Sequence, residues 1–217
     1  MILHLHGFAS AGEGTKAQLL RQAFPDEPVI SPTLNSDPEQ AVETIKSYCC
    51  QCPSNNPPLI VGISLGGFYA LVTNALYGYP AVVINPSLEP HYSLRQQLGK
   101  NVNLATGETF CLTERHLQCL ETYTKYLSRM SVDRIMLIVA LDDQVLPPQA
   151  AISRFRQAYA IVPFEKAGHR FEPFEEVIPM IKTFREHCQI SQQNHCPNTN
   201  KERSWHGVQL GPLPAEG

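Results

Sequence analysis

No stretch of this 217-residue chain stays apolar over the length that a bilayer-spanning helix needs. Residues 1–7 also lack the basic start and the long apolar run of a secretory signal peptide. A surplus of basic residues is missing too, since 17 Lys and Arg stand against 20 Asp and Glu, with no basic stripe that carries interleaved aromatic residues. We therefore expect a cytoplasmic protein with no membrane span and no nucleic-acid partner.

Paired cysteine spacings are absent as well. The chain has an odd set of seven, which in a reducing compartment predicts free thiols: Cys49, Cys50, Cys52, Cys111, Cys119, Cys188 and Cys196. The pairs His187-Cys188 and His195-Cys196 suggest zinc ligands, but they lie in a polar region and lack partners two to four residues away. The sequence therefore predicts neither a disulfide framework nor a metal site.

The 217 residues, 43% of them apolar, suffice for one well-buried domain. Apolar runs alternate with amphipathic helical segments, which predicts an α/β fold with a mostly parallel sheet covered by helices on both faces. We expect strands at about residues 2–5, 28–30, 59–63, 81–84, 134–140 and 159–165. We expect helices at residues 14–23, 38–50 and 174–188, the second with Asp37 as its N-cap.

Two segments fall outside this alternation. Residues 86–132 are too long for a simple connection and carry a helical pattern at 116–127, so we expect them to cover the mouth of the site. From Gln189 onward the sequence turns polar and cannot bury enough apolar surface to offset the entropy of ordering. The predicted organisation is one domain over residues 1–188 and a mobile tail over 189–217.

The most informative motif is Gly62-Ile63-Ser64-Leu65-Gly66-Gly67, which separates an apolar strand pattern from a mostly apolar helical pattern. A strand, then Gly-x-Ser-x-Gly, then a helix is the layout of a nucleophile elbow. The residue at the apex of so tight a turn adopts an unfavourable backbone geometry, and the flanking glycines let neighbouring chain pass closely. Ser64 is therefore the predicted nucleophile, and a plain strand-turn-helix connection is the alternative.

A serine hydroxyl needs a base to remove its proton as it attacks. His169 lies in Ala167-Gly168-His169-Arg170-Phe171, just after the last expected strand and just before the last helix. Catalytic groups gather at this C-terminal edge of open α/β sheets, and the other histidines lack such a placement. His169 is the predicted base, with an unpartnered loop histidine as the alternative, and His6 is assigned to shaping the loop after the first strand.

The base in turn needs a carboxylate that holds its tautomer. Three of the five aspartates precede the nucleophile or start a strand at the wrong end of the sheet: Asp26, Asp37 and Asp133. We favour Asp143, because the Asp-x-Val-x-Pro sequence that begins there can pin its loop, and we treat Asp142 as an outward, solvated neighbour or, alternatively, the acid itself. The chain order Ser64, Asp143, His169 is the α/β-hydrolase order.

Backbone N–H groups must stabilise the oxyanion that forms. Leu65 offers one as the first helical residue after the nucleophile, and Gly7 allows a sharp bend that turns the Phe8 N–H inward. The same loop has a competing interpretation, because Gly7 and Gly12 have the spacing of a phosphate-binding loop. Glu13 stands where that motif needs Lys, and its carboxylate repels phosphate, so we expect no nucleotide binding.

These residues resemble the short α/β-hydrolases of the YqiA-like esterase family over about residues 2–187. The motifs that match are Leu5-His6-Gly7-Phe8, the elbow through Ala70, Ala81-Val82-Val83-Ile84-Asn85-Pro86, Thr106-Gly107-Glu108 and Gly168-His169-Arg170-Phe171. The resemblance implies about six parallel strands in the spatial order 2-1-3-4-5-6, with a crevice beside Ser64 where the order reverses. It also implies Ser64, Asp143 and His169 as the triad. The family has Gly where this chain has Asp142, and the tail after His187 has no counterpart in it.

The predicted function is a serine esterase that cleaves small acyl ester or thioester substrates through an acyl-enzyme and uses no cofactor. An acyl-CoA thioesterase with the same triad is one alternative. A catalytically silent hydrolase-fold protein that binds a small ligand or a partner is the other, because fold does not fix function.

Overall fold

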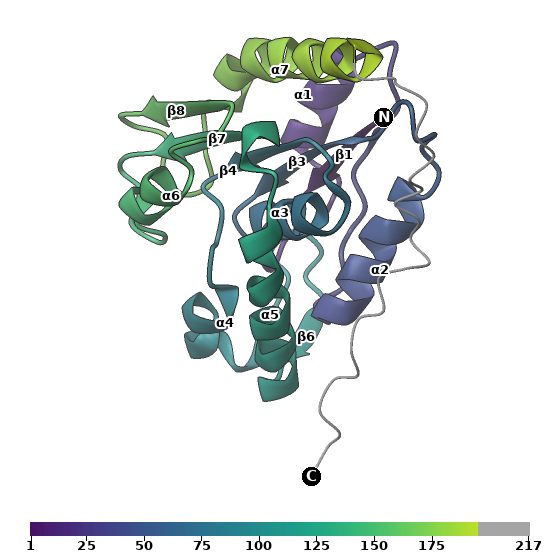
Figure 1. Cartoon of the computed structure of the whole chain (residues 1–217). Coiled ribbons are helices and arrows are strands. Elements are labelled where there is room, and N and C mark those ends of the chain that lie inside the picture. The colour runs from purple at the N-terminus through teal and green to yellow at the C-terminus, as the bar shows by residue number, and fades with distance from the viewer. Residues whose placement is uncertain (195–217) are drawn as a thin grey trace.

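Six parallel strands form the central sheet of the computed structural model, which describes residues 1–194 (Figure 1). They are β1 (Ile2–Leu5), β2 (Val29–Ile30), β3 (Leu59–Ile63), β4 (Ala81–Ile84), β7 (Ile135–Ala140) and β8 (Ala160–Phe164). Their spatial order is β2-β1-β3-β4-β7-β8, and every neighbouring pair is parallel. The predicted fold class and strand order are confirmed, and no strand boundary differs from its expected position by more than one residue.

Helices cover both faces of this sheet (Figure 1). The described residues contain α1 (Thr15–Ala23), α2 (Pro38–Cys49), α3 (Leu65–Tyr77), α4 (Pro90–Ser93), α5 (Glu114–Tyr126), α6 (Pro148–Arg154) and α7 (Phe174–Asn194). Successive strand residues point to opposite faces, so Leu3 and Ile60 pack with α2, α3 and α5, whereas Ile2 and Val61 pack with α1 and α7. Burial on both faces explains why the strands read as uninterrupted apolar runs.

The ends of the helices follow from local sequence. Asp37 caps α2 as predicted, because its side chain accepts the N–H of Glu39 at 2.9 Å and Pro38 occupies the first helical position. Helix α7 continues past the predicted end at Cys188 to Asn194, the last described residue, and no Gly or Pro occurs between these two positions. The rest of the predicted tail, residues 195–217, lies outside the described residues. Within residues 1–194, no helix combines the length and the apolar character needed to cross a membrane.

The segment over residues 86–132 folds into α4, a short 3-10 helix at Arg95–Gln97, an antiparallel hairpin and α5. The predicted helical pattern at 116–127 corresponds to α5, but the hairpin of β5 (Gly99–Val102) and β6 (Thr109–Leu112) was not predicted. Its strands are short and partly exposed, so they lack the long apolar run that identifies the central strands. Its turn contains Gly107 at a φ of 76°.

The hairpin rests on the loop that follows β1. The Leu104 N–H donates to the Ala9 carbonyl, and the Asn103 amide donates to the Ser10 carbonyl, both at 2.8 Å. The ring of Phe110 meets that of Phe8 edge-on, with centroids 5.5 Å apart. The segment therefore lies against the loop that carries Phe8, beside the carboxyl end of β1.

Candidate active site

Ser64 stands between β3 and α3 with a φ of 55° and a ψ of −117°, a conformation that non-glycine residues seldom adopt. The chain passes so closely here that a Cβ on Gly62 would collide with the backbone of Gly66, and a Cβ on Gly66 with the carbonyl of Leu5. The Ser64 N–H donates to the Ile84 carbonyl at 3.0 Å and ties the turn to the next strand. The turn has the geometry of a nucleophile elbow, which a plain connection between strand and helix does not need.

His169 lies between Ser64 and Asp143. Its Nε2 is 2.9 Å from Ser64 Oγ, and its Nδ1 is 2.8 Å from Asp143 Oδ2. Asp143 Oδ1 accepts the N–H groups of Val145 at 2.8 Å and Leu146 at 3.0 Å, and the carboxylate side chain is only 1% exposed. A proton on Nδ1 suits the carboxylate, which leaves Nε2 as the acceptor for the serine hydroxyl. The three residues predicted as a triad thus form one hydrogen-bonded line.

The carboxylate of the neighbouring residue Asp142 bonds to the backbone of the His169 loop, whereas Asp143 pairs with the ring. Asp142 Oδ1 accepts the N–H groups of Ala167 and Gly168, each at 2.9 Å. These two backbone bonds hold the pKa of Asp142 below its usual range. Asp142 therefore anchors the loop on which His169 stands, and Asp143 is the carboxylate that reaches the imidazole.

Asn85 contributes to the site in a way that the sequence alone did not reveal. It follows β4 with a φ of 43°, and its Oδ1 accepts the Ala140 N–H at 2.8 Å. Its Nδ2 donates to the carbonyls of Gly168 at 3.0 Å and His169 at 3.1 Å. One buried amide thus joins the end of β7 to the His169 loop. The Val-Ile-Asn-Pro motif marks this position, but the contacts depend on segments more than 50 residues away along the chain.

His6 fixes the start of the loop after β1. Its Nε2 accepts the Leu34 N–H at 2.8 Å, so its Nδ1 carries the proton and donates to the Gly7 carbonyl at 2.8 Å. Burial lowers the pKa of His6, which favours this neutral form. The Gly7 carbonyl and the Phe8 N–H belong to one trans peptide and point in opposite directions, so this bond turns the Phe8 N–H away from His6. A methyl group on Gly7 would lie 3.4 Å from Ser64 Cβ, which places the loop beside the serine.

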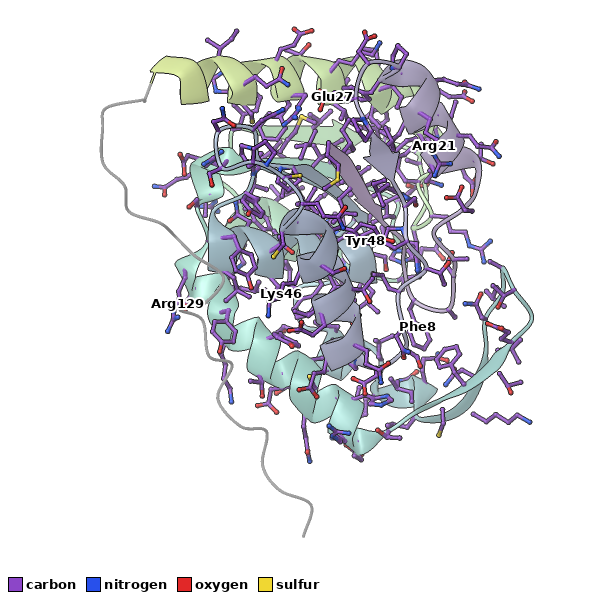
Figure 2. All side chains as sticks on the ribbon, turned by 90° about the vertical axis from the view of Figure 1, so that its right-hand side faces the viewer. Phe8, Arg21, Glu27, Lys46, Tyr48 and Arg129 are labelled. Carbon is purple, nitrogen blue, oxygen red and sulfur yellow. The ribbon has the colours of Figure 1, made fainter. Side chains whose placement is uncertain are left out.

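Two cavities meet along the Phe8 loop. The larger, of about 890 Å³, is lined by Ser64 and His169, and the smaller, of about 410 Å³, extends toward Tyr69 and Leu120. Residues 6–10 and Leu65 line both. Figure 2 shows Phe8 on the side of the hairpin, well away from α7 and Glu27 at the top of the view. The serine hydroxyl therefore opens into a space large enough for a small substrate.

The described part of the chain contains no group of three or more His, Cys, Asp or Glu side chains that could hold a metal ion. The cysteines of this part are free thiols, as their spacing predicts: Cys49, Cys50, Cys52, Cys111, Cys119 and Cys188. His195 and Cys196, the other half of the zinc hypothesis, lie outside the described residues.

The sequence profile of the Uncharacterised protein family (UPF0227) matches residues 1–186. The chain belongs to this family. Among its relatives is a UPF0227 protein of Shewanella sp. (strain ANA-3), 27% identical over 190 residues that cover 85% of this chain and 99% of the relative. The UPF0227 protein YcfP of Escherichia coli O9:H4 (strain HS) is 26% identical over 189 residues, which cover 85% of this chain and 98% of YcfP. The resemblance to the YqiA-like family is confirmed at this level.

Solved structures with the same architecture include Est1E from Butyrivibrio proteoclasticus, with a TM-score of 0.63 and 13% identity over 88% of each chain. Another is the monoacylglycerol lipase of Paleococcus ferrophilus, with a TM-score of 0.66 and 15% identity over 86% of this chain and 94% of that one. At such identities the likeness establishes the fold alone. This UPF0227 protein has a single-domain α/β-hydrolase fold.

Proposed function

We propose that this UPF0227 protein is a serine hydrolase that cleaves acyl esters through an acyl-enzyme. The observation that carries the proposal is the hydrogen-bonded line from Asp143 through His169 to Ser64, at the edge of a cavity of about 890 Å³. Nucleophile, base and carboxylate come from three separate loops. Each of the three residues is held in place by hydrogen bonds that involve the backbone. A structural histidine on a loop needs no such arrangement.

In the acylation step, Ser64 Oγ attacks the ester carbonyl carbon while His169 Nε2 takes the hydroxyl proton. Asp143 keeps the second imidazole proton on Nδ1 and stabilises the imidazolium that forms. The tetrahedral intermediate then collapses, the leaving alkoxide takes the proton from Nε2, and the acyl group stays on Ser64. Water is the second nucleophile, because His169 can accept its proton and release the acid by the reverse sequence.

The oxyanion of the tetrahedral intermediate is assigned two backbone donors. The Leu65 N–H is the first of α3 and has no acceptor within the helix, so it can donate to the oxyanion. The Phe8 N–H is the second, because the bond from His6 to the Gly7 carbonyl turns it away from His6 and the loop lies against Ser64. Removing one such donor costs on the order of a hundredfold to a thousandfold in rate.

Ester and thioester substrates use the same residues and the same steps, so an acyl-CoA thioesterase remains the runner-up within this class. A silent binding protein is a different class, and the intact line of hydrogen bonds through His169 argues against it. Neither alternative changes which serine is reactive.

The test is labelling by a fluorophosphonate probe, which reacts only with an activated serine. We expect one equivalent of label on Ser64, loss of label in Ser64→Ala, and full labelling of Ser128→Ala, which removes an exposed serine outside both cavities. Hydrolysis of 4-nitrophenyl butyrate falls on the order of 10⁴-fold or more in Ser64→Ala and in His169→Ala. Absence of labelling in the folded wild-type protein would overturn the proposal, as would label that persists in Ser64→Ala.

A further inference from the structure

Three basic side chains line the cavity that contains Ser64: those of Lys16, Lys100 and Arg170. The ion pairs formed among residues 1–194 leave all three without a carboxylate partner within 4 Å. The whole chain carries a formal charge of −3, whereas this cavity is lined by three unpaired cations and is therefore locally positive. Such a wall favours an anionic ligand.

Lys16 and Arg170 are near enough to repel each other. Lys16 is half-buried in the first turn of α1, with Nζ 5.7 Å from the ring centroid of Phe174. Burial lowers the pKa of Lys16, the charge of Glu172 opposes this shift, and the charge of Arg170 has a smaller effect that lowers the pKa further. The partial burial of the Lys16 ammonium, with the exposed cation of Arg170 nearby, costs free energy in the unliganded protein. An anion that binds between them offsets this cost.

Among residues 1–194, Glu13 is the only acidic residue that lines this cavity, and its charge is already compensated. Both carboxylate oxygens accept from the guanidinium of Arg21, at 2.6 and 2.7 Å. This bidentate pair gives Glu13 a partner other than Lys16. The carboxylate that weighs against a phosphate loop in the sequence therefore does not neutralise Lys16 or Arg170 in the fold.

The cations line the same cavity as Ser64 and His169. Arg170 directly follows His169, whose Nε2 is 2.9 Å from Ser64 Oγ. Elsewhere the same cavity is lined by apolar side chains that are unusually exposed, namely Val102 at 49%, Leu104 at 74% and Val145 at 63%. The cavity thus pairs an apolar wall, formed by these side chains of the hairpin and the Asp143 loop, with cations from α1 and the His169 loop, and Lys100 of β5 adds a third cation on the hairpin side.

We propose that Lys16 and Arg170 bind an anionic group of the substrate, so that the preferred esters carry a carboxylate or a phosphate close to the scissile bond. The apolar wall accepts the hydrocarbon part of the same molecule. This inference rests on the proposed hydrolase function, because it assigns the charge of the substrate that Ser64 attacks. It requires no change in the chemistry of the triad.

The test compares three esters of equal acyl length. They are 4-nitrophenyl butyrate, which is neutral, 4-nitrophenyl hemisuccinate, which carries a carboxylate on the acyl group, and 4-(phosphonooxy)phenyl butyrate, which carries a phosphate on the leaving group. With the spontaneous rate subtracted and each kcat/KM divided by the ester's rate constant for alkaline hydrolysis, we expect the value for at least one anionic ester to exceed that for the neutral ester by about 10- to 100-fold at low salt, as for one or two charge-assisted hydrogen bonds. The anionic ester that gains most shows on which side of the scissile bond the charge lies.

Lys16→Met and Arg170→Gln are the variants that connect this preference to the cations. We expect each to raise KM for the preferred anionic ester, and to reduce its kcat/KM at least fivefold more than that of the neutral ester. Lys16→Arg keeps most of the preference. Lys125→Met is the matched control, because Lys125 stands on α5 and lines neither cavity.

Two results would overturn the inference: a wild-type protein that does not favour either anionic ester, or variants that slow neutral and anionic esters by the same factor. Labelling by an uncharged fluorophosphonate separates this failure from failure of the hydrolase proposal. Normal labelling with no charge preference removes only the anion site. Absence of labelling removes both.

Discussion

Asp142 and Gly168, 26 residues apart in the chain, are joined by a hydrogen bond of 2.9 Å from the Gly168 N–H to Asp142 Oδ1. Asp142 also accepts the Ala167 N–H, while the Asn85 amide donates to the carbonyl of Gly168 from β4. The side chains of Asp142 and Asn85 therefore both hold the backbone of the loop that carries His169. The two adjacent aspartates have different partners: Asp142 bonds to the backbone of the His169 loop, and Asp143 bonds to the imidazole ring.

This division predicts different effects for two matched substitutions. Asp143→Asn lowers kcat for 4-nitrophenyl butyrate on the order of 10⁴-fold, because an amide cannot stabilise the imidazolium and favours the wrong tautomer. Asp142→Asn keeps an oxygen acceptor for the two backbone N–H groups, so kcat falls by less than about tenfold. Steady-state kinetics of the two variants, with circular dichroism as the control for folding, compares them. A larger loss in Asp142→Asn would make Asp142 the acid.

Asn85→Leu removes three hydrogen bonds at once, to Ala140 and to the carbonyls of Gly168 and His169. We expect kcat to fall about 100-fold with a smaller change in KM, because the imidazole loses its position while the cavity stays intact. The free energy of unfolding falls by about 1–3 kcal/mol, as for buried groups left unpaired.

Asn55→Leu is the matched control for this change, since Asn55 is exposed in a loop before β3. Urea unfolding and the rate of fluorophosphonate labelling measure the two effects separately. Labelling at the wild-type rate in a folded Asn85→Leu protein would show that Asn85 has no part in positioning His169.

The central sheet is predictable from the sequence for a physical reason. Strands β3 and β7 are buried on both faces, so each is an uninterrupted apolar run, and the glycines around Ser64 are required by close backbone contacts. The choice between Asp142 and Asp143 depends on the path of one turn, which residue types alone leave open. Asp143 reaches His169 because its own N–H donates to the Ala140 carbonyl and closes the turn directly after β7.

Other parts of the site depend on contacts that no local pattern encodes. The hairpin of β5 and β6 has four-residue strands, which are too short to show a clear period. The Asn85 amide bridges segments 55 and 83 residues further along the chain. Lys16 and Arg170 meet in one cavity wall although α1 and the His169 loop stand at opposite ends of the described chain. Long-range geometry of this kind appears only in the folded protein.

His4 makes the stability of the fold depend on pH. Burial lowers its pKa to about 3, the charges of His6, Lys16 and Arg21 act in the same direction, and Glu13 opposes them. In the unfolded chain His4 titrates near 6.5. Its neutral form therefore contributes its full stability above pH 6.5, and the contribution falls by up to about 1.4 kcal/mol per pH unit between pH 6.5 and 3, where only the unfolded chain binds the proton.

We expect urea unfolding to give a free energy about 2 kcal/mol lower at pH 5.0 than at pH 6.5 from His4 alone. His4→Asn can keep a partner for Ser31 Oγ, which lies 2.7 Å from His4 Nδ1, and removes the titrating group. The variant therefore loses a smaller amount of stability over this pH range than the wild type, although burial also lowers the pKa of His6 and leaves part of the dependence. Equal losses in both proteins would show that His4 is not the group responsible.

Arg185 offers a test of stability that is separate from the active site. Its side chain is 2% exposed, donates to both carboxylate oxygens of Glu27 at 2.7–3.1 Å, and donates to Asn56 Oδ1 and the Pro57 carbonyl at 3.0 Å. Arg185→Met leaves Asn56 Oδ1 and the Pro57 carbonyl without this donor, whereas Glu27 keeps the Met1 ammonium at 3.0 Å, so we expect the free energy of unfolding to fall by about 1–3 kcal/mol. Glu186→Gln, an exposed neighbour on α7, changes it by less than about 0.5 kcal/mol. Because Glu27 lies near α7 and well away from Phe8 (Figure 2), we expect the folded fraction of Arg185→Met to label at Ser64 at the wild-type rate. A variant that keeps wild-type stability in urea would show that the network around Arg185 adds nothing to the fold, and a folded variant that fails to label would show that it reaches the active site.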